Sequence, residues 1–203
     1  METLRDRLDL LDYRRRMAAL YAEARASGRG AGAWGRWREG RDDLFANHPQ
    51  TALDSEDLEE FSGLSFFDYD PGWRFEVEVE PVEEEELAVG HSGEGFTAFR
   101  RFGQVEFEAA GSTIGLCLYW LHAYGGGVFL PFWDATSGDE TYDGGRYLLD
   151  SAKGADLGHE GSRIVLDFNY SYHPSCVYSY RWSCPLAPPE NHLTVPIRAG
   201  ERF

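Results

Sequence analysis

Lysine is almost absent from this chain of 203 residues: of its 19 basic residues, only Lys153 is a lysine. Acidic residues number 35, so the formal net charge is -16 at pH 7. Asp and Glu hold hydration water strongly, whereas the long lysine stem exposes apolar surface. A protein that has to remain folded in molar salt therefore favours acids over lysine. The composition predicts an acidic, halophilic protein of a salt-loaded cytoplasm.

Long apolar runs are also lacking. No stretch of the sequence approaches the roughly 20 apolar residues that a membrane-spanning helix needs. The first residues, METLRDRLDLLDYRRR, contain no apolar core of a signal peptide. We therefore expect a soluble protein that is not exported by the usual route. The excess of negative charge repels nucleic acid and anionic lipid head groups, so we expect neither as a partner.

The N-terminal part of the chain has a helical pattern. Residues 4–26 carry apolar side chains at spacings of three and four with charges between them, which is typical of an amphipathic helix. The apolar positions are Leu4, Leu8, Leu11, Met17, Leu20, Tyr21 and Ala24. A second helix is expected over residues 35–46, before the turn at 47–49. A short third helix is expected from Ser55, with Asp54 or Ser55 as its N-cap.

From residue 66 the pattern alternates instead. Phe75, Val77 and Val79 are separated by glutamates, which predicts a strand with one apolar face and one solvated face. The other expected strands are 96–102, 105–109, 113–121, 128–133, 164–168 and 193–197. The acidic run 83–86 is interpreted as a solvated turn.

This order of elements predicts an α+β fold that is mainly antiparallel β, because helices come first and many short strands follow. We expect the sheet to curl into a barrel or half-barrel, preceded by two or three N-terminal helices. With 42% hydrophobic and 15% aromatic residues, the chain has ample material for one core. Residues 1–62 are expected to form a helical arm that makes one compact unit with a β-rich domain of residues 63–203.

Two segments are dense in polar residues and look unlike ordinary surface loops. The first is PFWDATSGDETYDGGRY (residues 131–147), and the second is DFNYSYHPSC (167–176), which continues through CPL (184–186) to PPEN (188–191). Together they resemble the family known as domain of unknown function 1684, found in bacteria and archaea. The resemblance is close from Arg100 to Glu201 and looser in the N-terminal helices. It implies membership of the family and no particular activity, because no reaction is assigned to that family.

The first polar segment contains two reverse-turn strings, 137–139 and 143–145, which bring polar side chains together. Arg146 is expected to pair with Glu140 or Asp134. In one interpretation these groups bind a ligand. In the other they satisfy one another, in a knot of hydrogen bonds and ion pairs that holds a sharp chain reversal.

The second polar segment places Asp167 and Asn169 on one face of a strand. Arg100 interrupts an apolar alternation and is their natural complement. If this face points into a barrel, the result is a pocket for a small polar or anionic ligand, and if it points outward it is plain surface. The expected ligand-binding residues are Arg100, Trp133, Asp134, Glu140, Tyr142, Arg146, Asp167 and Asn169.

Three residues near the C-terminus have the spacing of metal ligands. The spacing of His173, Cys176 and Cys184 along the sequence is close to that of zinc ligands, and His192 or Glu190 could supply the fourth ligand. A disulfide between the two cysteines and a pair of free buried thiols are the alternatives.

These features leave three hypotheses. The first is a protein that binds a small polar or anionic molecule in a barrel pocket. The second is a hydrolase-like enzyme assisted by zinc at the His/Cys site. The third is a structural or homodimeric protein whose N-terminal helices supply an interface with Trp34 and Trp37. No G-x-S-x-G motif marks a nucleophilic serine.

Overall fold

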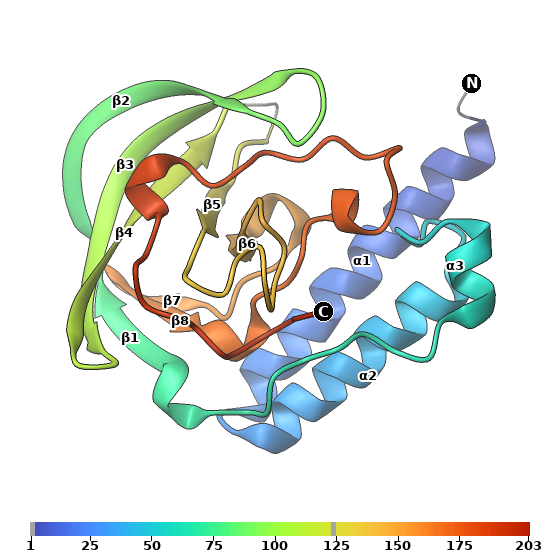
Figure 1. Cartoon of the computed structure of the whole chain (residues 1–203), viewed down its shortest axis with the longest axis horizontal. Helices are drawn as coiled ribbons and strands as arrows, with labels where there is room; N and C mark the ends of the chain where they lie inside the picture. Colours follow the sequence, from blue (N-terminus) through green and yellow to red (C-terminus); the bar gives the residue numbers. More distant parts are fainter. Residues whose placement is uncertain (1–2, 123–124) are drawn as a thin grey trace.

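The computed structural model describes residues 3–122 and 125–203. The described residues form three α-helices, eight β-strands and five short 3₁₀ helices. The helices gather on one side of the molecule, and a strongly curved sheet occupies the other (Figure 1). The predicted class, α+β with mainly antiparallel strands after N-terminal helices, is confirmed.

Helix α1 (Leu4–Ser27) begins and ends with recognisable caps. The Thr3 hydroxyl accepts a hydrogen bond from the backbone N–H of Asp6 at 3.1 Å, and the Asp6 carboxylate accepts one from the N–H of Thr3 at 2.7 Å. These two bonds form a capping box. At the other end, Gly28 takes a positive φ of 77°, which glycine adopts without steric cost.

Only the C-terminal two-thirds of the apolar stripe on α1 is covered. Met17, Tyr21 and Ala24 are buried. The first three positions of the stripe are exposed, at 76% for Leu4, 56% for Leu8 and 60% for Leu11. Helix α2 (Ala31–Asn47) explains the difference, because it runs back along α1 and ends where the ring of His48 meets the ring of Tyr13, 5.3 Å away. The first turns of α1 extend beyond that point.

Helix α2 begins at Ala31, four residues earlier than expected, and helix α3 (Ser55–Glu60) has Asp54 at its N-cap as predicted. The indoles of Trp34 and Trp37 are buried against Phe66 and Tyr170. They are therefore part of the interior and are not available to a partner, so a homodimer, which stays a prediction, requires another face.

The larger sheet has the strand order β2-β3-β4-β5-β6, with every neighbouring pair antiparallel. Its strands are β2 (Glu80–Gly90), β3 (Phe96–Ala109), β4 (Ser112–Leu121), β5 (Val128–Phe132) and β6 (Arg146–Asp150). The two strands expected over 96–109 are one long strand, whose register shifts between Arg101 and Gly103. Strand β6 is an element that the sequence pattern did not indicate.

The acidic run 83–86 lies within β2, so its interpretation as a turn is wrong. Its glutamates are exposed, and three of them pair across the sheet with arginines of β3: Glu85 with Arg101 at 2.6 Å, and both Glu84 and Glu86 with Arg100, at 3.3 and 3.1 Å. Opposite charges on facing strands stabilise the pairing. A row of charge on an edge strand also discourages pairing with another chain.

The smaller sheet has the order β1-β8-β7, with β1 (Arg74–Glu78), β7 (His159–Glu160) and β8 (Arg163–Asp167). The two sheets stay separate, so the expected barrel does not close. Within the described chain β2 and β6 are both edges, and closure would require them to pair. Residues 193–197 form no strand there either. They run beside residues 133–135, which follow β5, with isolated bonds from Leu193 N–H to Trp133 O and from Ala135 N–H to Val195 O.

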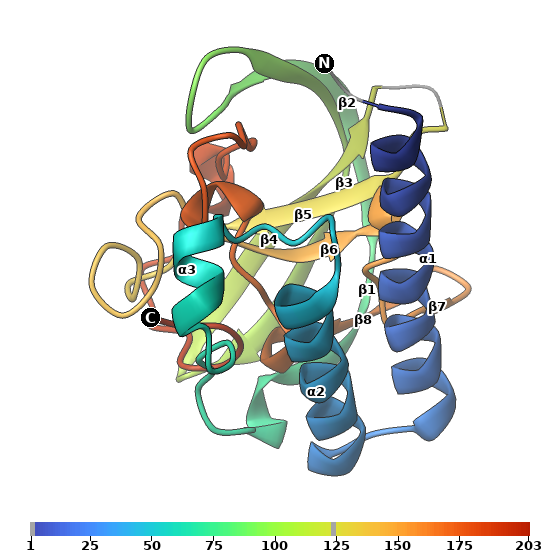
Figure 2. The same ribbon diagram turned by 90° about the vertical axis from the view of Figure 1, so that its right-hand side faces the viewer.

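Two apolar clusters hold these parts together. One fills the space between the sheets, with Phe107, Leu116, Phe132 and Phe168 among its buried members. The other joins α1 and α2 to the chain around Tyr170. In Figure 2 the two long helices stand side by side in front of the strands. Among the described residues, no helix combines the length and the apolar character needed to cross a membrane.

Candidate functional site

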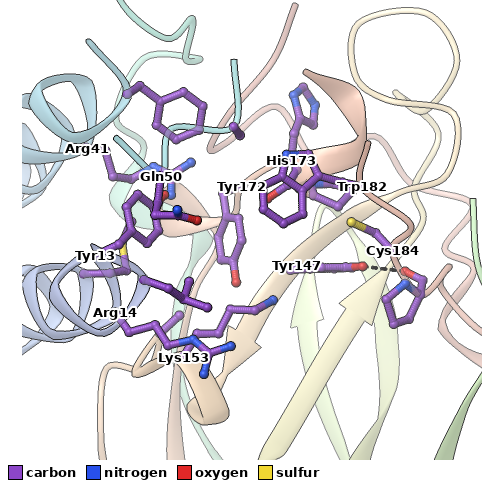
Figure 3. A pocket seen from close by; sticks show the side chains of 18 of the residues that line it. Tyr13, Arg14, Arg41, Gln50, Tyr147, Lys153, Tyr172, His173, Trp182 and Cys184 are labelled. Atoms are coloured by element: carbon purple, nitrogen blue, oxygen red, sulfur yellow. Dashed lines mark hydrogen bonds between the residues drawn. The ribbon is translucent and has the colours of Figure 1, made fainter. Parts of the chain in front are cut away.

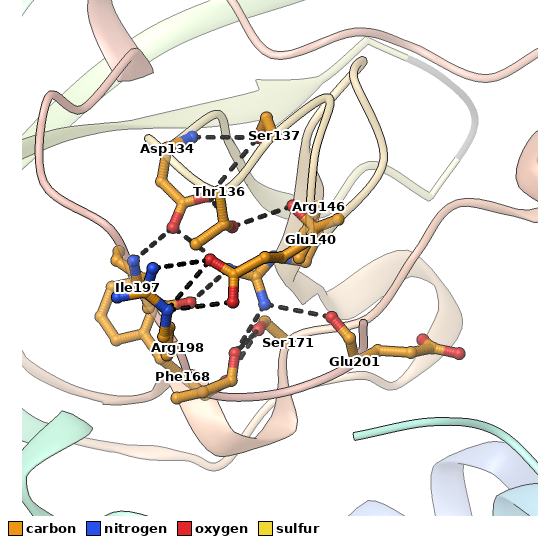
Figure 4. Close-up of polar contacts among 12 residues, drawn as sticks. Asp134, Thr136, Ser137, Glu140, Arg146, Phe168, Ser171, Ile197, Arg198 and Glu201 are labelled. Atoms are coloured by element: carbon orange, nitrogen blue, oxygen red, sulfur yellow. Dashed lines mark hydrogen bonds and ion pairs between the residues drawn. The ribbon is translucent and has the colours of Figure 1, made fainter. Parts of the chain in front are cut away.

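The predicted pair of Asp134 and Arg146 forms, and it is fully buried (Figure 4). The Arg146 guanidinium donates to an Asp134 carboxylate oxygen at 3.3 Å, to Ala199 O at 2.6 Å and to Ile197 O at 2.8 Å. Asp134 also accepts from Thr136 Oγ1 and from the N–H of Ile197. These contacts match the alternative of a knot whose polar groups bind one another, although Nε of Arg146 has no partner among the described residues. The knot fastens the C-terminal segment to the chain reversal at 134–141.

The other predicted residues of this segment point to separate partners. Glu140 accepts two hydrogen bonds from Arg198 Nε, at 2.9 and 3.0 Å, at the surface. The indole N–H of Trp133 donates to the backbone oxygen of Asp143, and its ring stacks on His192. Tyr142 donates its backbone N–H to His173 Nε2 at 3.2 Å.

Asp167 and Asn169 form a second cluster elsewhere. The side-chain amide of Asn169 donates to Asp167 Oδ1 and to the backbone oxygen of Asp70, both at 2.8 Å, and the backbone oxygen of Asn169 accepts from the Trp34 indole. Burial raises the pKa of Asp167. Arg100 lies on β3 of the larger sheet, where it is paired with Glu86. The structure therefore does not bring Arg100, the Asp134–Arg146 knot and the Asp167 cluster to one pocket.

Asp167 lines a cavity of about 230 Å³ that is rich in arginine. The arginines that line it are Arg25, Arg29 and Arg74. All three are ion-paired, either to Asp156 or to Glu76. Because all three cations are paired and the carboxylate of Asp167, 3.7 Å from Arg74, lies in the lining itself, this cavity has little charge left for an anionic ligand.

The predicted zinc ligands do not form a metal cluster in the described part of the chain, where no group of three or more His, Cys, Asp and Glu side chains is arranged to hold an ion. Cys176 and Cys184 are free thiols. Zinc at these residues stays a prediction, for which metal analysis of the purified protein is the test.

A different cavity, of about 260 Å³, lies between the long helices and the C-terminal segment (Figure 3). Helix α1 supplies one wall, because side chains at spacings of three and four project from the same face of a helix. The remaining walls come from α2, β6 and the segments around residues 153 and 172–185. The lining residues are Leu10, Tyr13, Arg14, Met17, Tyr21, Arg41, Phe45, Gln50, Ala52, Tyr147, Lys153, Ala155, Tyr172, His173, Pro174, Ser175, Trp182, Ser183, Cys184 and Pro185. We call this space the tyrosine cavity.

The charged side chains that line the tyrosine cavity are all basic: Arg14, Arg41 and Lys153. Arg14 is exposed and forms no ion pair or hydrogen bond with any residue that the structure describes. The only lysine of the chain lies 2.8 Å from Asp150, and Arg41 lies 3.1 Å from Glu201. Both of these carboxylates belong to residues outside the lining.

Three buried polar atoms of lining residues have no hydrogen-bond partner within the described residues: the hydroxyl of Tyr21, Nε of Arg41 and the indole nitrogen of Trp182. The side chains of Tyr21 and Arg41 are almost fully buried. Buried polar groups are normally paired with protein or ordered water. Three unpaired donors at a cavity therefore favour a polar guest or water at that place.

The tyrosines of the cavity remain neutral hydrogen-bond donors at ordinary pH. Burial raises the pKa of Tyr13, Tyr21, Tyr147 and Tyr172, because it disfavours the phenolate. The hydroxyl of Tyr147 donates to Pro185 O. Those of Tyr13 and Tyr172 have no partner among the described residues and are available to a guest.

His173 is neutral and forms part of the same wall. Burial, reinforced by the charges of Arg146 and Arg41, lowers its pKa to about 3. Since Nε2 accepts the hydrogen bond from Tyr142, the proton of the neutral ring lies on Nδ1. A neutral, deeply buried imidazole with one nitrogen already used is a structural element of the wall.

Of the residues proposed from sequence, four lie at or near the tyrosine cavity: His173 and Cys184 line it, and Tyr142 and Cys176 contact them. Its basic residues and the four tyrosines of its lining were missed. One signal was present in the sequence: a lone lysine in a chain that otherwise avoids lysine. The tyrosines gave no such signal, because an aromatic residue on the inner face of a helix usually belongs to a core.

Comparison with known proteins agrees with this picture of the fold. A solution NMR structure of an uncharacterized protein from the halophile Haloarcula marismortui matches with a TM-score of 0.58 and 34% identity, over 82% of this chain and 90% of that chain. A search of curated proteins gives no match. The family model described as "Protein of unknown function (DUF1684)" matches residues 59–202. The chain therefore belongs to the DUF1684 family.

Proposed function

We propose that this protein binds a small anionic molecule with an apolar body in the tyrosine cavity. The observation that carries the proposal is the sign of the charge there. Acids outnumber bases 35 to 19 in the chain, yet the charged side chains of the lining are Arg14, Arg41 and Lys153. Charged residues drawn at random from this sequence would be mostly acidic.

The position of the counter-charges supports an anionic guest. Arg41 and Lys153 are each held by a carboxylate from outside the lining, while Arg14 has no described partner. Figure 3 shows Arg14 and Lys153 at one side of the cavity, with the hydroxyl end of Tyr172 directed toward them. A cation and neutral phenol donors together suit a carboxylate or phosphate oxygen, because charge-assisted hydrogen bonds are the stronger ones.

The remaining walls suit an apolar body. Rings of Phe45, Tyr147 and Trp182 line the cavity together with Leu10 and Met17. The volume of about 260 Å³ lies near the lower end of the usual range for small-molecule sites, roughly 300–1,000 Å³. It therefore fits a compact metabolite, such as an aryl or branched alkyl carboxylate, and is too small for a dinucleotide.

The net charge of the chain bears on how such a ligand arrives. At low ionic strength a charge of -16 repels an approaching anion. In molar salt the screening length falls to about 3 Å, which removes this repulsion but affects partly buried contacts much less. Anion binding is therefore compatible with the acidic surface when salt is high.

Titration with 3-phenylpropionate in 1 M KCl, followed by NMR of backbone amides, tests the proposal. We expect shifts at residues of the tyrosine cavity, and affinity roughly tenfold lower in Arg14→Ala because one charge-assisted contact is lost. Arg15→Ala is the matched control: it removes the same charge from the next position of α1, where Arg15 pairs with Asp12 and does not line the cavity.

The uncharged analogue 3-phenylpropanol separates recognition of the anion from simple filling of an apolar space. The proposal requires it to bind more weakly than the carboxylate, and equally in Arg14→Ala and in the unaltered chain. Equal affinity for the acid and the alcohol, or equal losses in Arg14→Ala and Arg15→Ala, would overturn it.

A further inference from the structure

The only lysine of the chain lies at the tyrosine cavity, where an arginine would supply the same charge. Lys153 is one of 19 basic residues, and all the others are arginines. A guanidinium holds a carboxylate at least as well as an ammonium, because it is always charged and can form two parallel hydrogen bonds. Arginine cannot lose its proton in a protein and therefore cannot act as a nucleophile, whereas lysine can. The lysine at this position thus points to a use of the amine itself.

A tight turn fixes the backbone of Lys153 at the cavity. Strand β6 ends at Asp150, and Asp150 and Ala155 exchange two backbone hydrogen bonds, both of 2.9 Å, which close the turn. Gly154 has a positive φ of 76° and packs on Ala18 of α1, where an added Cβ would come within 2.6 Å of the Ala18 Cβ. The turn is therefore held between β6 and α1, while the side chain of Lys153, 55% exposed, remains within reach of a guest.

A buried carboxylate lies beside this amine. Asp150 Oδ2 is 2.8 Å from Lys153 Nζ, and the side chain of Asp150 is only 2% exposed. Its other oxygen, Oδ1, has no hydrogen-bond partner among the described residues, so few bonds compete for this carboxylate. Asp150 is thus placed to take the proton that the ammonium must lose before its nitrogen can attack, and to return that proton later.

We propose that Lys153 forms an imine with the carbonyl group of a 2-oxo acid bound in the tyrosine cavity. The inference rests on the proposed function and narrows it to one class of anion. In a 2-oxo acid the carbonyl carbon is bonded directly to the carboxylate carbon. Arg14 and Lys153 lie at the same side of the cavity (Figure 3), so a carboxylate held by Arg14 brings the carbonyl group to Lys153.

The step balances without a further reactant. The Lys153 ammonium passes one proton to the Asp150 carboxylate, and its nitrogen attacks the carbonyl carbon. A C–N bond forms, the π bond of the carbonyl breaks, and a proton moves from nitrogen to oxygen to give a hydroxyl group. The hydroxyl end of Tyr172 is directed toward Lys153 and suits the negative charge that develops on this oxygen. Asp150 then returns its proton to the new hydroxyl, which leaves as water while the C=N bond forms.

Trapping with phenylpyruvate and sodium cyanoborohydride tests the proposal on the unaltered, full-length protein. Phenylpyruvate is 3-phenylpropionate with a carbonyl group next to its carboxylate, and the reductant converts its imine to a stable secondary amine. In 1 M KCl we expect one adduct per chain, heavier by phenylpyruvic acid less one oxygen atom, and a peptide map that places it on Lys153. Because 3-phenylpropionate lacks the carbonyl, it should suppress the adduct by roughly tenfold at about ten times its Kd.

The α-amine at the N-terminus is an internal control. An unperturbed α-amine has a pKa near 8, against about 10.4 for lysine, so at about pH 7.5 it holds far more free base and should react first if the cavity has no role. We expect Lys153 to react faster instead, by roughly tenfold or more. Arg14→Ala should slow the reaction at Lys153, whereas Arg15→Ala, which alters the neighbouring position outside the lining, should not.

Faster reaction at the N-terminus than at Lys153, or an adduct on Lys153 that 3-phenylpropionate does not suppress, would overturn the proposal. The NMR titration distinguishes this failure from that of the proposed function. If 3-phenylpropionate shifts the amides of the cavity but phenylpyruvate leaves no adduct on Lys153, the imine is excluded and anion binding stands. If neither acid shifts them, both proposals fail.

Discussion

A single buried imidazole gives the stability of this protein a measurable dependence on pH. The folded pKa of His173, about 3, lies below the value of about 6.5 for an exposed histidine. Between these values the unfolded chain binds a proton that the folded chain does not, so stability is fully present above pH 6.5 and falls as pH decreases. The loss is about 1.4 kcal/mol per pH unit, or about 2 kcal/mol at pH 5.

His173→Gln isolates this contribution, because the glutamine carbonyl reaches about as far as Nε2 of histidine and can still accept the hydrogen bond from Tyr142. We expect urea unfolding to show a smaller decrease in the free energy of unfolding between pH 7 and pH 5 in the variant than in the unaltered chain. All carboxylates and the other histidines are common to both proteins, so their titration cancels in the comparison. Identical pH slopes would contradict the prediction.

Individual side-chain partners were predictable from the sequence only where they are close along the chain. The turns between them indicated that Arg146 pairs with Asp134 or with Glu140, and the structure has the first of these pairs. The pairing of Arg100 with Glu86 depends on the register of β2 against β3, which alternation alone does not set. The tyrosine cavity could not be predicted from the sequence for a similar reason, because it forms only where α1, β6 and the C-terminal segment meet.

At the scale of elements, periodicity predicted the helices well and the strands unevenly. Helix α1 and the long strands β3 and β4 have patterns sustained over ten or more residues. The acidic run of β2 has no apolar alternation, because a strand at an exposed edge needs no apolar face there, so its pattern is that of a solvated turn. Residues 193–197 alternate like a strand, yet they are held by isolated bonds and by the Asp134–Arg146 knot. Such tertiary contacts cannot be recognised from the local periodicity of apolar residues in the sequence.

The knot attaches the C-terminal segment to the rest of the molecule through a fully buried ion pair. We expect Asp134→Asn to lower the free energy of unfolding by about 3–5 kcal/mol, because it leaves the buried Arg146 charge without its counter-ion. Glu140→Gln is the matched control: it breaks the exposed pair with Arg198 in the same segment, and such pairs contribute little. Chemical denaturation of both variants measures the difference, and comparable losses in the two would show that burial of the knot has no special role.

Over the whole molecule, the acids of the strands and the basic side chains of the tyrosine cavity lie in different places. The acids of β1, β2 and β3 lie on exposed faces, where they hold water and repel other chains. The basic side chains of the tyrosine cavity lie between the helices and the C-terminal segment. The sequence predicted the first part of this arrangement, since alternation places the glutamates of a strand on one face. The second part required the fold.

The acidic exterior determines how the whole molecule responds to salt. At 0.1 M the screening length of about 10 Å lets many of the 35 acids repel one another, whereas about 3 Å at 1 M leaves mostly contact pairs. The folded chain holds these charges closer together than the unfolded chain, so screening stabilises the folded state. We therefore expect Tm to rise by several degrees between 0.1 and 2 M KCl, a salt chosen because it is not strongly kosmotropic. Sucrose at matched osmolality controls for exclusion of cosolute from the surface and should raise Tm less. A Tm that is flat or falls with KCl would mean that the acids are adequately neutralised by their own arginines.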